Sequence, residues 1–127
     1  MAQYIDGFVF SIPSGRLPQY QEIANQIASI YKEYGAIEYQ EFVGDDMEKE
    51  GTLPFPTLLA STPDEIVVFG WIAYQSREER DRINTCIETD DRVAMLVAPL
   101  IDPLDRVFNP ARMAFGGFRP FIEVIGD

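Results

Sequence analysis

Two stretches of this chain are apolar on both of their alternating faces, and they constrain the fold more than any other feature. They read YIDGFVFSI over residues 4–12 and EIVVFGWIAY over residues 65–74. Both are short and rich in aromatic and β-branched residues, which is typical of strands. Because a strand without a polar face must be covered on both sides, both segments are predicted to be central strands of a sheet.

An amphipathic helix is predicted after each of these strands. Over residues 16–34 the apolar side chains recur every three or four positions and form one stripe, and Gly35 supplies a C-terminal stop. The second helix is predicted over residues 76–88, where Ser76 and Glu79 have the spacing of a capping box. The helices can therefore cover one face of the neighbouring strands.

Two further strands complete the pattern. Residues 36–43 are more polar, which suits a sheet edge, and residues 112–124 contain Pro120, which also favours an edge position. The order strand, helix, strand, strand, helix, strand predicts an α+β protein with the ferredoxin-like split βαβ arrangement, βαββαβ. Its sheet is expected to be antiparallel overall, with the first and third strands central and parallel to each other.

The length of 127 residues predicts a single ferredoxin-like domain, residues 1–127, with inserted loops at about residues 44–64 and 98–111. In the first insert, residues 57–60 are expected to pair back on the third strand. Before the second insert, a short helix is expected around residues 93–97.

The composition argues against several classes of partner. With 21 acidic and 10 basic residues the formal net charge is −11, which repels nucleic acid and anionic membrane lipids. The chain contains no histidine, so imidazole-based catalysis and zinc or haem ligation are not expected. The acid pairs at residues 45–46 and 90–91 lack EF-hand spacing, so neither a metal nor another cofactor is predicted.

The single cysteine favours a reducing compartment. Cys86 cannot form an internal disulfide, and residues 1–11 lack the basic region and the uninterrupted apolar run of a signal peptide. A cytoplasmic location is therefore predicted. Cys86 lies on the apolar stripe of its helix and is expected to be an inert, buried thiol.

Four blocks in order along the chain resemble the uncharacterised bacterial YbaA-like family, a domain of unknown function in the dimeric α/β barrel group. The blocks are YIDGF at residue 4, YGAIEY at residue 34, VVFGWIAYQS at residue 67 and FNPARMAFGGF at residue 108. The chain departs from the family pattern in the loop at residues 99–110 and at Arg119 and Pro120. The resemblance implies a ferredoxin-like protomer whose sheet packs on that of a second copy, and it implies no activity.

Alternation divides the side chains of each central strand into two sets. One set is aliphatic or glycine and is expected to face the helices: Ile5, Gly7, Val9, Ile66, Val68, Gly70 and Ile72. The other set is aromatic with one acid, and it is expected to face a partner sheet or a cavity: Asp6, Phe8, Phe10, Phe69 and Trp71. These aromatic side chains either pack a dimer core or line a site for a small hydrophobic ligand.

Asp6 is the one ionisable residue within the first predicted strand, apart from the terminal tyrosine. Burial would favour its neutral form unless a cation or hydrogen-bond donors compensate, so Asp6 is a candidate general base beside an apolar cavity. The alternative is a structural ion pair, which we favour because such pairs perturb carboxylates as well. Antiparallel pairing is expected to place Arg119, rather than Arg112, beside Asp6.

Gly116 and Gly117 interrupt the last predicted strand where side chains should pack. The pair predicts either a β-bulge or a tight approach by a partner chain. No helix is predicted to follow, so the glycines do not indicate a phosphate-binding loop.

Two hypotheses for function follow, and the sequence leaves both open. The first is a homodimeric binding or structural module with no chemistry of its own. The second is a cofactor-independent enzyme, oxygenase-like or isomerase-like, acting on a small hydrophobic molecule in the barrel cavity. Fold analogy alone is weak support for the second hypothesis.

Overall fold

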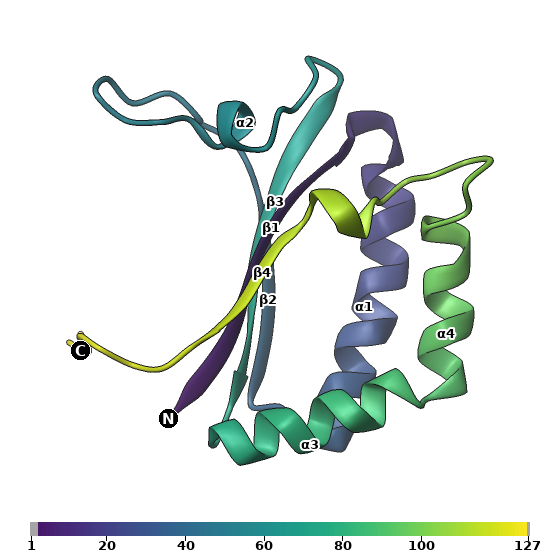
Figure 1. Ribbon diagram of the computed structural model, residues 1–127, viewed down its shortest axis with the longest axis vertical. Helices are drawn as coiled ribbons and strands as arrows, with labels where there is room; N and C mark the ends of the chain where they lie inside the picture. Colours follow the sequence, from purple (N-terminus) through teal and green to yellow (C-terminus); the bar gives the residue numbers. More distant parts are fainter. Residues whose placement is uncertain (1–2, 127) are drawn as a thin grey trace.

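The structure, a computed structural model, describes residues 3–126 and shows an α+β protein built on one four-stranded sheet (Figure 1). Residues 1, 2 and 127 of the predicted domain lie outside the described residues. The strands are β1 (Tyr4–Pro13), β2 (Glu38–Val43), β3 (Glu65–Tyr74) and β4 (Ala114–Phe118), in the order β2-β3-β1-β4. The two strands without a polar face are therefore central, as predicted.

All neighbouring strands run antiparallel, so the prediction that the first and third strands are parallel is wrong. The helix after β1 returns the chain to the starting end of the sheet, which makes β2 run in the same direction as β1. β3 then pairs antiparallel with β2 and takes the place between β1 and β2. The parallel pair is thus β1 and β2, and β3 separates them.

The first helix, α1 (Leu17–Tyr34), confirms the prediction made from its apolar stripe. A single 3-10 turn, Ser14–Arg16, precedes it, and Pro18 lies in the first turn, where its missing N–H breaks no helical hydrogen bond. The helix ends at Gly35, whose φ of 117° is a left-handed conformation that favours glycine.

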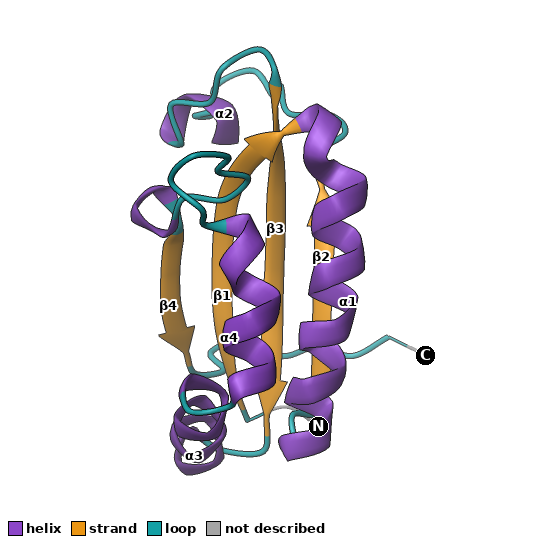
Figure 2. Cartoon of the chain, turned by 90° about the vertical axis from the view of Figure 1, so that its right-hand side faces the viewer, coloured by secondary structure: helices purple, strands orange, loops and turns teal. Residues whose placement is uncertain are grey.

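Helices α3 (Arg77–Glu88) and α4 (Asp91–Val97) follow β3, and both lie close to the predicted positions. The Ser76 hydroxyl caps α3 by accepting a hydrogen bond from the Glu79 N–H at 3.1 Å. The Glu79 carboxylate binds Arg82 instead of completing the capping box. Figure 2 shows α1 and α4 lying along one face of the sheet, while α3 crosses near the ends of the strands.

The main core lies between the sheet and these helices. Its most deeply buried apolar side chains come from β1, β3 and α3: Phe10, Ile12, Val68, Tyr74 and Ile83. Residues 98–111 also contribute, because Leu100 and Val107 are buried in this core and the Phe108 ring packs edge-on against Phe10 at 4.9 Å. This segment therefore closes the core between α4 and β4.

The insert at residues 44–64 lies on the opposite face of the sheet (Figure 1). Residues 57–60 were predicted to pair with the third strand, which is wrong, because residues 55–58 form the short helix α2 (Phe55–Leu58). Pro54 and Pro56 explain the difference, since proline suits the first turn of a helix and donates no hydrogen bond to a strand. Leu59 packs against Val9 and Val67 and anchors the insert on the sheet.

The last strand is shorter than predicted. β4 is an edge strand, as expected, but it ends at Phe118 instead of Val124, and residues 119–126 leave the sheet without regular structure. Pro120 lacks the donor that a continuing strand needs. None of the helices within residues 3–126 is both long enough and apolar enough to cross a membrane.

Candidate functional site

The strand register decides which side chains share a face of the sheet. It pairs Asp6, Phe8 and Phe10 of β1 with Ile72, Gly70 and Val68 of β3. Directly paired residues lie on the same face, so Phe8 and Phe10 are buried beneath the helices, with exposed fractions of 7% and 2%. The prediction that they share a face with Phe69 and Trp71 is wrong, because it grouped residues by chemical likeness instead of by register.

The other face of the sheet, which we call the open face, carries large exposed aromatic side chains. Phe42, Phe69 and Phe118 have exposed fractions of 48%, 43% and 57%. Trp71 is half-buried among them, with its ring centroid 5.2 Å from that of Phe42 and its Nε1 donating to Glu38 Oε1 at 2.6 Å. The prediction that Phe69 and Trp71 point away from the helices is therefore confirmed.

A hollow of about 440 Å³ lies over β1, β3 and β4 on the open face. It is lined by apolar residues and glycine of the three strands: Ile5, Gly7, Phe8, Val9, Phe69, Gly70, Trp71, Ala114, Phe115, Gly116 and Phe118. Among these, Phe8 and Phe115 pair in the register and stack their rings on the helix side of the sheet. The insert with α2 and the C-terminal segment both lie on this side of the sheet (Figure 1). No ionisable side chain from residues 3–126 lines the hollow.

Asp6 lies on the helix side of the sheet and is completely buried. Its Oδ1 accepts a hydrogen bond from Arg80 Nη1 at 3.2 Å, and its Oδ2 accepts from the Tyr74 hydroxyl at 3.1 Å and from Asn84 Nδ2 at 3.3 Å. Arg80 also donates to the Tyr4 hydroxyl at 2.9 Å. This geometry is that of a structural ion pair in which both carboxylate oxygens of Asp6 accept hydrogen bonds, whereas Arg80 Nε is buried without a hydrogen-bond partner among the described residues.

The cation beside Asp6 is Arg80 of α3, so the prediction of Arg119 is wrong. Arg119 follows the end of β4 and is exposed. The prediction considered only neighbouring strands, whereas α3 crosses the strand ends and brings Arg80 to Asp6. Asp6 is also absent from the lining of the hollow on the open face.

Gly117 makes room for this ion pair. It lies opposite Asp6 in the β1–β4 register, and a Cβ at this position would lie 2.9 Å from Arg80 Nη2 and closer still to the Tyr4 hydroxyl. The pairing of β4 with β1 is continuous from Ala114 to Phe118, so the predicted bulge is wrong. The close approach is made by side chains of the same chain; an approach by a partner chain at Gly116 stays a prediction.

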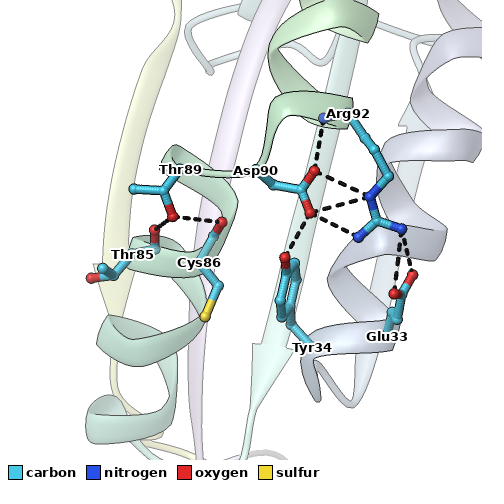
Figure 3. Close-up of polar contacts among 7 residues, drawn as sticks. All are labelled: Glu33, Tyr34, Thr85, Cys86, Thr89, Asp90 and Arg92. Carbon is cyan, nitrogen blue, oxygen red and sulfur yellow. Dashed lines mark hydrogen bonds and ion pairs between the residues drawn. The ribbon is translucent and has the colours of Figure 1, made fainter.

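A second polar cluster joins the end of α1 to the start of α4 (Figure 3). Asp90 accepts a hydrogen bond from the Tyr34 hydroxyl at 2.6 Å and caps α4 by accepting from the Arg92 N–H at 2.8 Å. The Arg92 side chain binds both Asp90 and Glu33. The Arg92 guanidinium, helped by Tyr34, holds the pKa of Asp90 well below its usual range. These contacts give Asp90 a structural role.

Cys86, in α3 next to this cluster, is a free cysteine and is half-buried instead of fully buried (Figure 3). Within residues 3–126 no group of three or more cysteine and acidic side chains could hold a metal ion.

A cleft between α1 and β2, which we call the Glu41 cleft, was not predicted from the sequence. Its volume is about 320 Å³, and its polar groups centre on Glu41, with Tyr20 from α1 and Tyr39 from β2. Glu41 Oε1 accepts a hydrogen bond from the Tyr20 hydroxyl at 2.5 Å. Glu41 Oε2 is buried and has no hydrogen-bond partner among the described residues.

Burial governs the ionisation of this group of side chains. It raises the pKa of Glu41 by more than the hydrogen bond from Tyr20 and the nearby Tyr39 hydroxyl lower it. Burial, together with the nearby Glu41 charge, also raises the pKa of Tyr20 and Tyr39, which keeps both hydroxyls protonated. The alternation of β2 was the only sequence signal for this site, since it places Glu41 on the same face as Tyr39 and Val43.

Comparison with known proteins identifies the family but no activity. Residues 3–105, which include the described α-helices and β1 to β3, match the family model of proteins of unknown function DUF1428. The chain is 31% identical over 121 residues to the uncharacterized protein YbaA of Escherichia coli K12, a match covering 95% of this chain and 98% of YbaA. The YbaA protein of Shigella flexneri matches equally well.

Solved structures show the same fold at low sequence identity. One is a nipsnap family protein with unknown function from Agrobacterium tumefaciens, with a TM-score of 0.55 and 15% identity over 94% of this chain and 88% of that chain. A second structure of the same Agrobacterium tumefaciens protein has a TM-score of 0.54 and 14% identity, covering 93% of each chain. Identities this low show the fold alone. From the family match and the YbaA relatives, the chain belongs to the DUF1428 family of proteins of unknown function.

Proposed function

We propose that this chain is a homodimeric binding or structural module, without chemistry of its own, in which the open face packs against the open face of a second copy. In this proposal each copy has a sheet of the ferredoxin-like type, and the two sheets pack together to form a dimeric α/β barrel. The observation that carries the proposal is the exposure of Phe42, Phe69 and Phe118 on a sheet face that the long helices leave uncovered. Contiguous apolar patches are rare on monomeric proteins and mark interaction surfaces.

Charge supports a second copy as the occupant of this face. With a net charge of −11, two copies repel each other over most of their surfaces. Among residues 3–126 no charged side chain lines the hollow on the open face, so two copies can meet over it without placing like charges together at its centre. Association about a two-fold axis would bring the same apolar patch from each copy into contact.

The C-terminal segment also supports this arrangement. Residues 119–126 leave β4 on the side of the open face (Figure 1) and carry four large apolar side chains with high exposed fractions. These are Phe121 at 91%, Ile122 at 80%, Val124 at 91% and Ile125 at 68%. A second copy on the open face would remove these side chains from water.

We favour binding over catalysis because the hollow lacks the ionisable group that the enzyme hypothesis requires. Asp6, the predicted base, lies on the other face of the sheet and is held by Arg80. An apolar space of this size would suit a small uncharged hydrophobic ligand. The proposal includes no cofactor, nucleic acid or membrane partner, and it includes a cytoplasmic location, which the single free cysteine supports.

The proposal can be tested by placing a charge on the open face. Phe69→Glu and Phe118→Glu should each give a protein of half the wild-type mass by size-exclusion chromatography with light scattering, because two buried carboxylates would oppose association. Leu104→Glu is the matched control, since Leu104 is 96% exposed in the loop on the helix side. Wild-type mass in all three variants would show that the open face is not the interface.

A further inference from the structure

We propose that the Glu41 cleft binds a small organic cation, an ammonium group on a compact apolar or aromatic body, with the Glu41 carboxylate as its counter-ion. The cleft lies on the helix side of the sheet, away from the open face. This binding site is therefore independent of the proposed dimer interface.

The cleft has the size and lining of a small-molecule site. α1 supplies one wall through side chains spaced three or four positions apart, among which Ala24 and Ala28 leave space next to β2. The strand wall is formed by Tyr39, Glu41 and Val43. A volume of about 320 Å³ is at the small end of the range for ligand pockets, so the ligand must be compact.

Glu41 lacks two things that an ammonium group provides. No lysine or arginine among residues 3–126 forms an ion pair with it, and its Oε2 accepts no hydrogen bond from the described residues. A buried carboxylate without a counter-charge is costly, and its burial raises its pKa. The terminal torsion of glutamate has a broad energy minimum, so a small rotation can present Oε2 to the cleft.

The charge of the site selects a cation over an anion or a neutral molecule. No lysine or arginine lines the cleft, and the net charge of −11 attracts cations to the protein. The amides of Gln21 and Asn25 give the ligand neutral hydrogen-bonding partners on the α1 wall. An ammonium group in the cleft would form a charge-assisted hydrogen bond to Oε2, the strongest type available there.

The pH dependence of binding follows from the groups that face Glu41. Tyr20 on α1 and Tyr39 on β2 both have raised pKa values and keep their protons, and β3 contributes only Val68. Among the described residues that line the cleft, Glu41 is then the one whose charge changes between acidic and neutral pH. Because the cation requires the carboxylate form, its affinity should rise as the pH rises through the pKa of Glu41.

Three probes of the same shape test the proposal: 2-phenylethylamine, which is cationic at neutral pH, 2-phenylethanol, which is neutral, and phenylacetate, which is anionic. Isothermal titration calorimetry should detect the amine, with the alcohol at least about tenfold weaker and phenylacetate undetected. Glu41→Gln should lower the affinity for the amine by about tenfold or more. Glu22→Gln, which removes the same charge from an exposed position on α1, should leave its affinity unchanged.

A second variant separates loss of charge from loss of space. Ala24→Leu should fill the cleft and abolish amine binding while Glu41 remains, and circular dichroism should show that the variant is folded. The proposal is overturned if the three probes bind equally, if Glu41→Gln binds the amine as the wild type does, or if the wild type does not bind the amine at millimolar concentration.

Discussion

Asp6 and Arg80 form an ion pair between the central strand β1 and helix α3, with Asp6 Oδ1 lying 3.2 Å from Arg80 Nη1. Asp6 is completely buried, and the side chain of Arg80 is 17% exposed. Tyr74 and Asn84 complete the hydrogen bonding of the carboxylate. The pair joins the end of the sheet to the helix that crosses it, so its loss should affect stability.

The first prediction is that Asp6→Asn destabilises the fold. The change removes the buried counter-charge of the Arg80 guanidinium and leaves only the exposed Asp81, whose Oδ1 lies 3.0 Å from Arg80 Nε. The expected cost is about 3 kcal/mol, the lower end for a buried pair, because Arg80 keeps this second partner and some contact with water. Urea unfolding of the two proteins measures the difference. Arg119→Gln, the control, should shift the unfolding free energy by less than about 0.5 kcal/mol, as exposed substitutions usually do. A midpoint for Asp6→Asn at or above that of the wild type would refute the structural role.

The second prediction compares two adjacent glycines. Gly117→Ala would force a methyl group against Arg80 and Tyr4, so it should lower the melting temperature. At Gly116 the nearest atom to an added Cβ is a Phe118 ring carbon at 3.8 Å, an ordinary contact. Gly116→Ala should therefore be neutral or stabilising by about 0.5 to 1 kcal/mol, because alanine loses less conformational entropy than glycine in a strand. Equal effects of the two substitutions would show that the ion pair does not need the space at Gly117.

Elements with a strong local pattern could be predicted from the sequence. The central strands and α1 were correct because their apolar periodicity covers the whole element. The length of β4 was predicted wrongly, because the alternation of side chains continues beyond Phe118. Pro120 and the absence of a further partner strand end the pairing there. The predicted orientation of the β1 side chains was also wrong, because the register that pairs Phe8 with Gly70 depends on two strands together.

The candidate sites show the same limit. The burial of Asp6 could be predicted from its position in an apolar strand, but its partner Arg80 depends on how α3 crosses the sheet. Glu41 was missed because a glutamate on a polar edge strand is typical of a solvent-facing position. Only the packing of α1 over β2 half-buries Glu41 and encloses its Oε2.

The third prediction concerns Glu41 and the pH dependence of stability. Because burial raises its pKa in the folded chain, the folded state binds more protons than the unfolded state between the two pKa values. The contribution of Glu41 to the unfolding free energy is therefore largest at low pH, and it is lost as the pH rises through the folded-state pKa. Glu41→Gln lacks this loss, so its stability relative to the wild type should increase from about pH 4 to about pH 8.

Urea unfolding at both pH values measures this change, with Glu22→Gln as the exposed control that should show no such increase. If the difference between wild type and Glu41→Gln stays constant or shrinks as the pH rises, the burial of Glu41 does not raise its pKa.

The fourth prediction uses Trp71, the single tryptophan of the chain. Trp71 is half-buried in one copy, and a second copy on the open face should shield it further. Acrylamide should therefore quench its fluorescence slowly in the wild type and faster in Phe118→Glu, in which association is opposed. Equally fast quenching in both proteins would place Trp71 on a surface that no partner covers.

Sedimentation equilibrium of the unmodified chain at micromolar concentration tests the central claim most directly. The uncovered aromatic face predicts one species of twice the 14.4 kDa chain mass at this concentration. This species should dissociate only when the protein is diluted further. A single species of 14.4 kDa over the whole concentration range would contradict the proposed homodimer and the barrel that it completes.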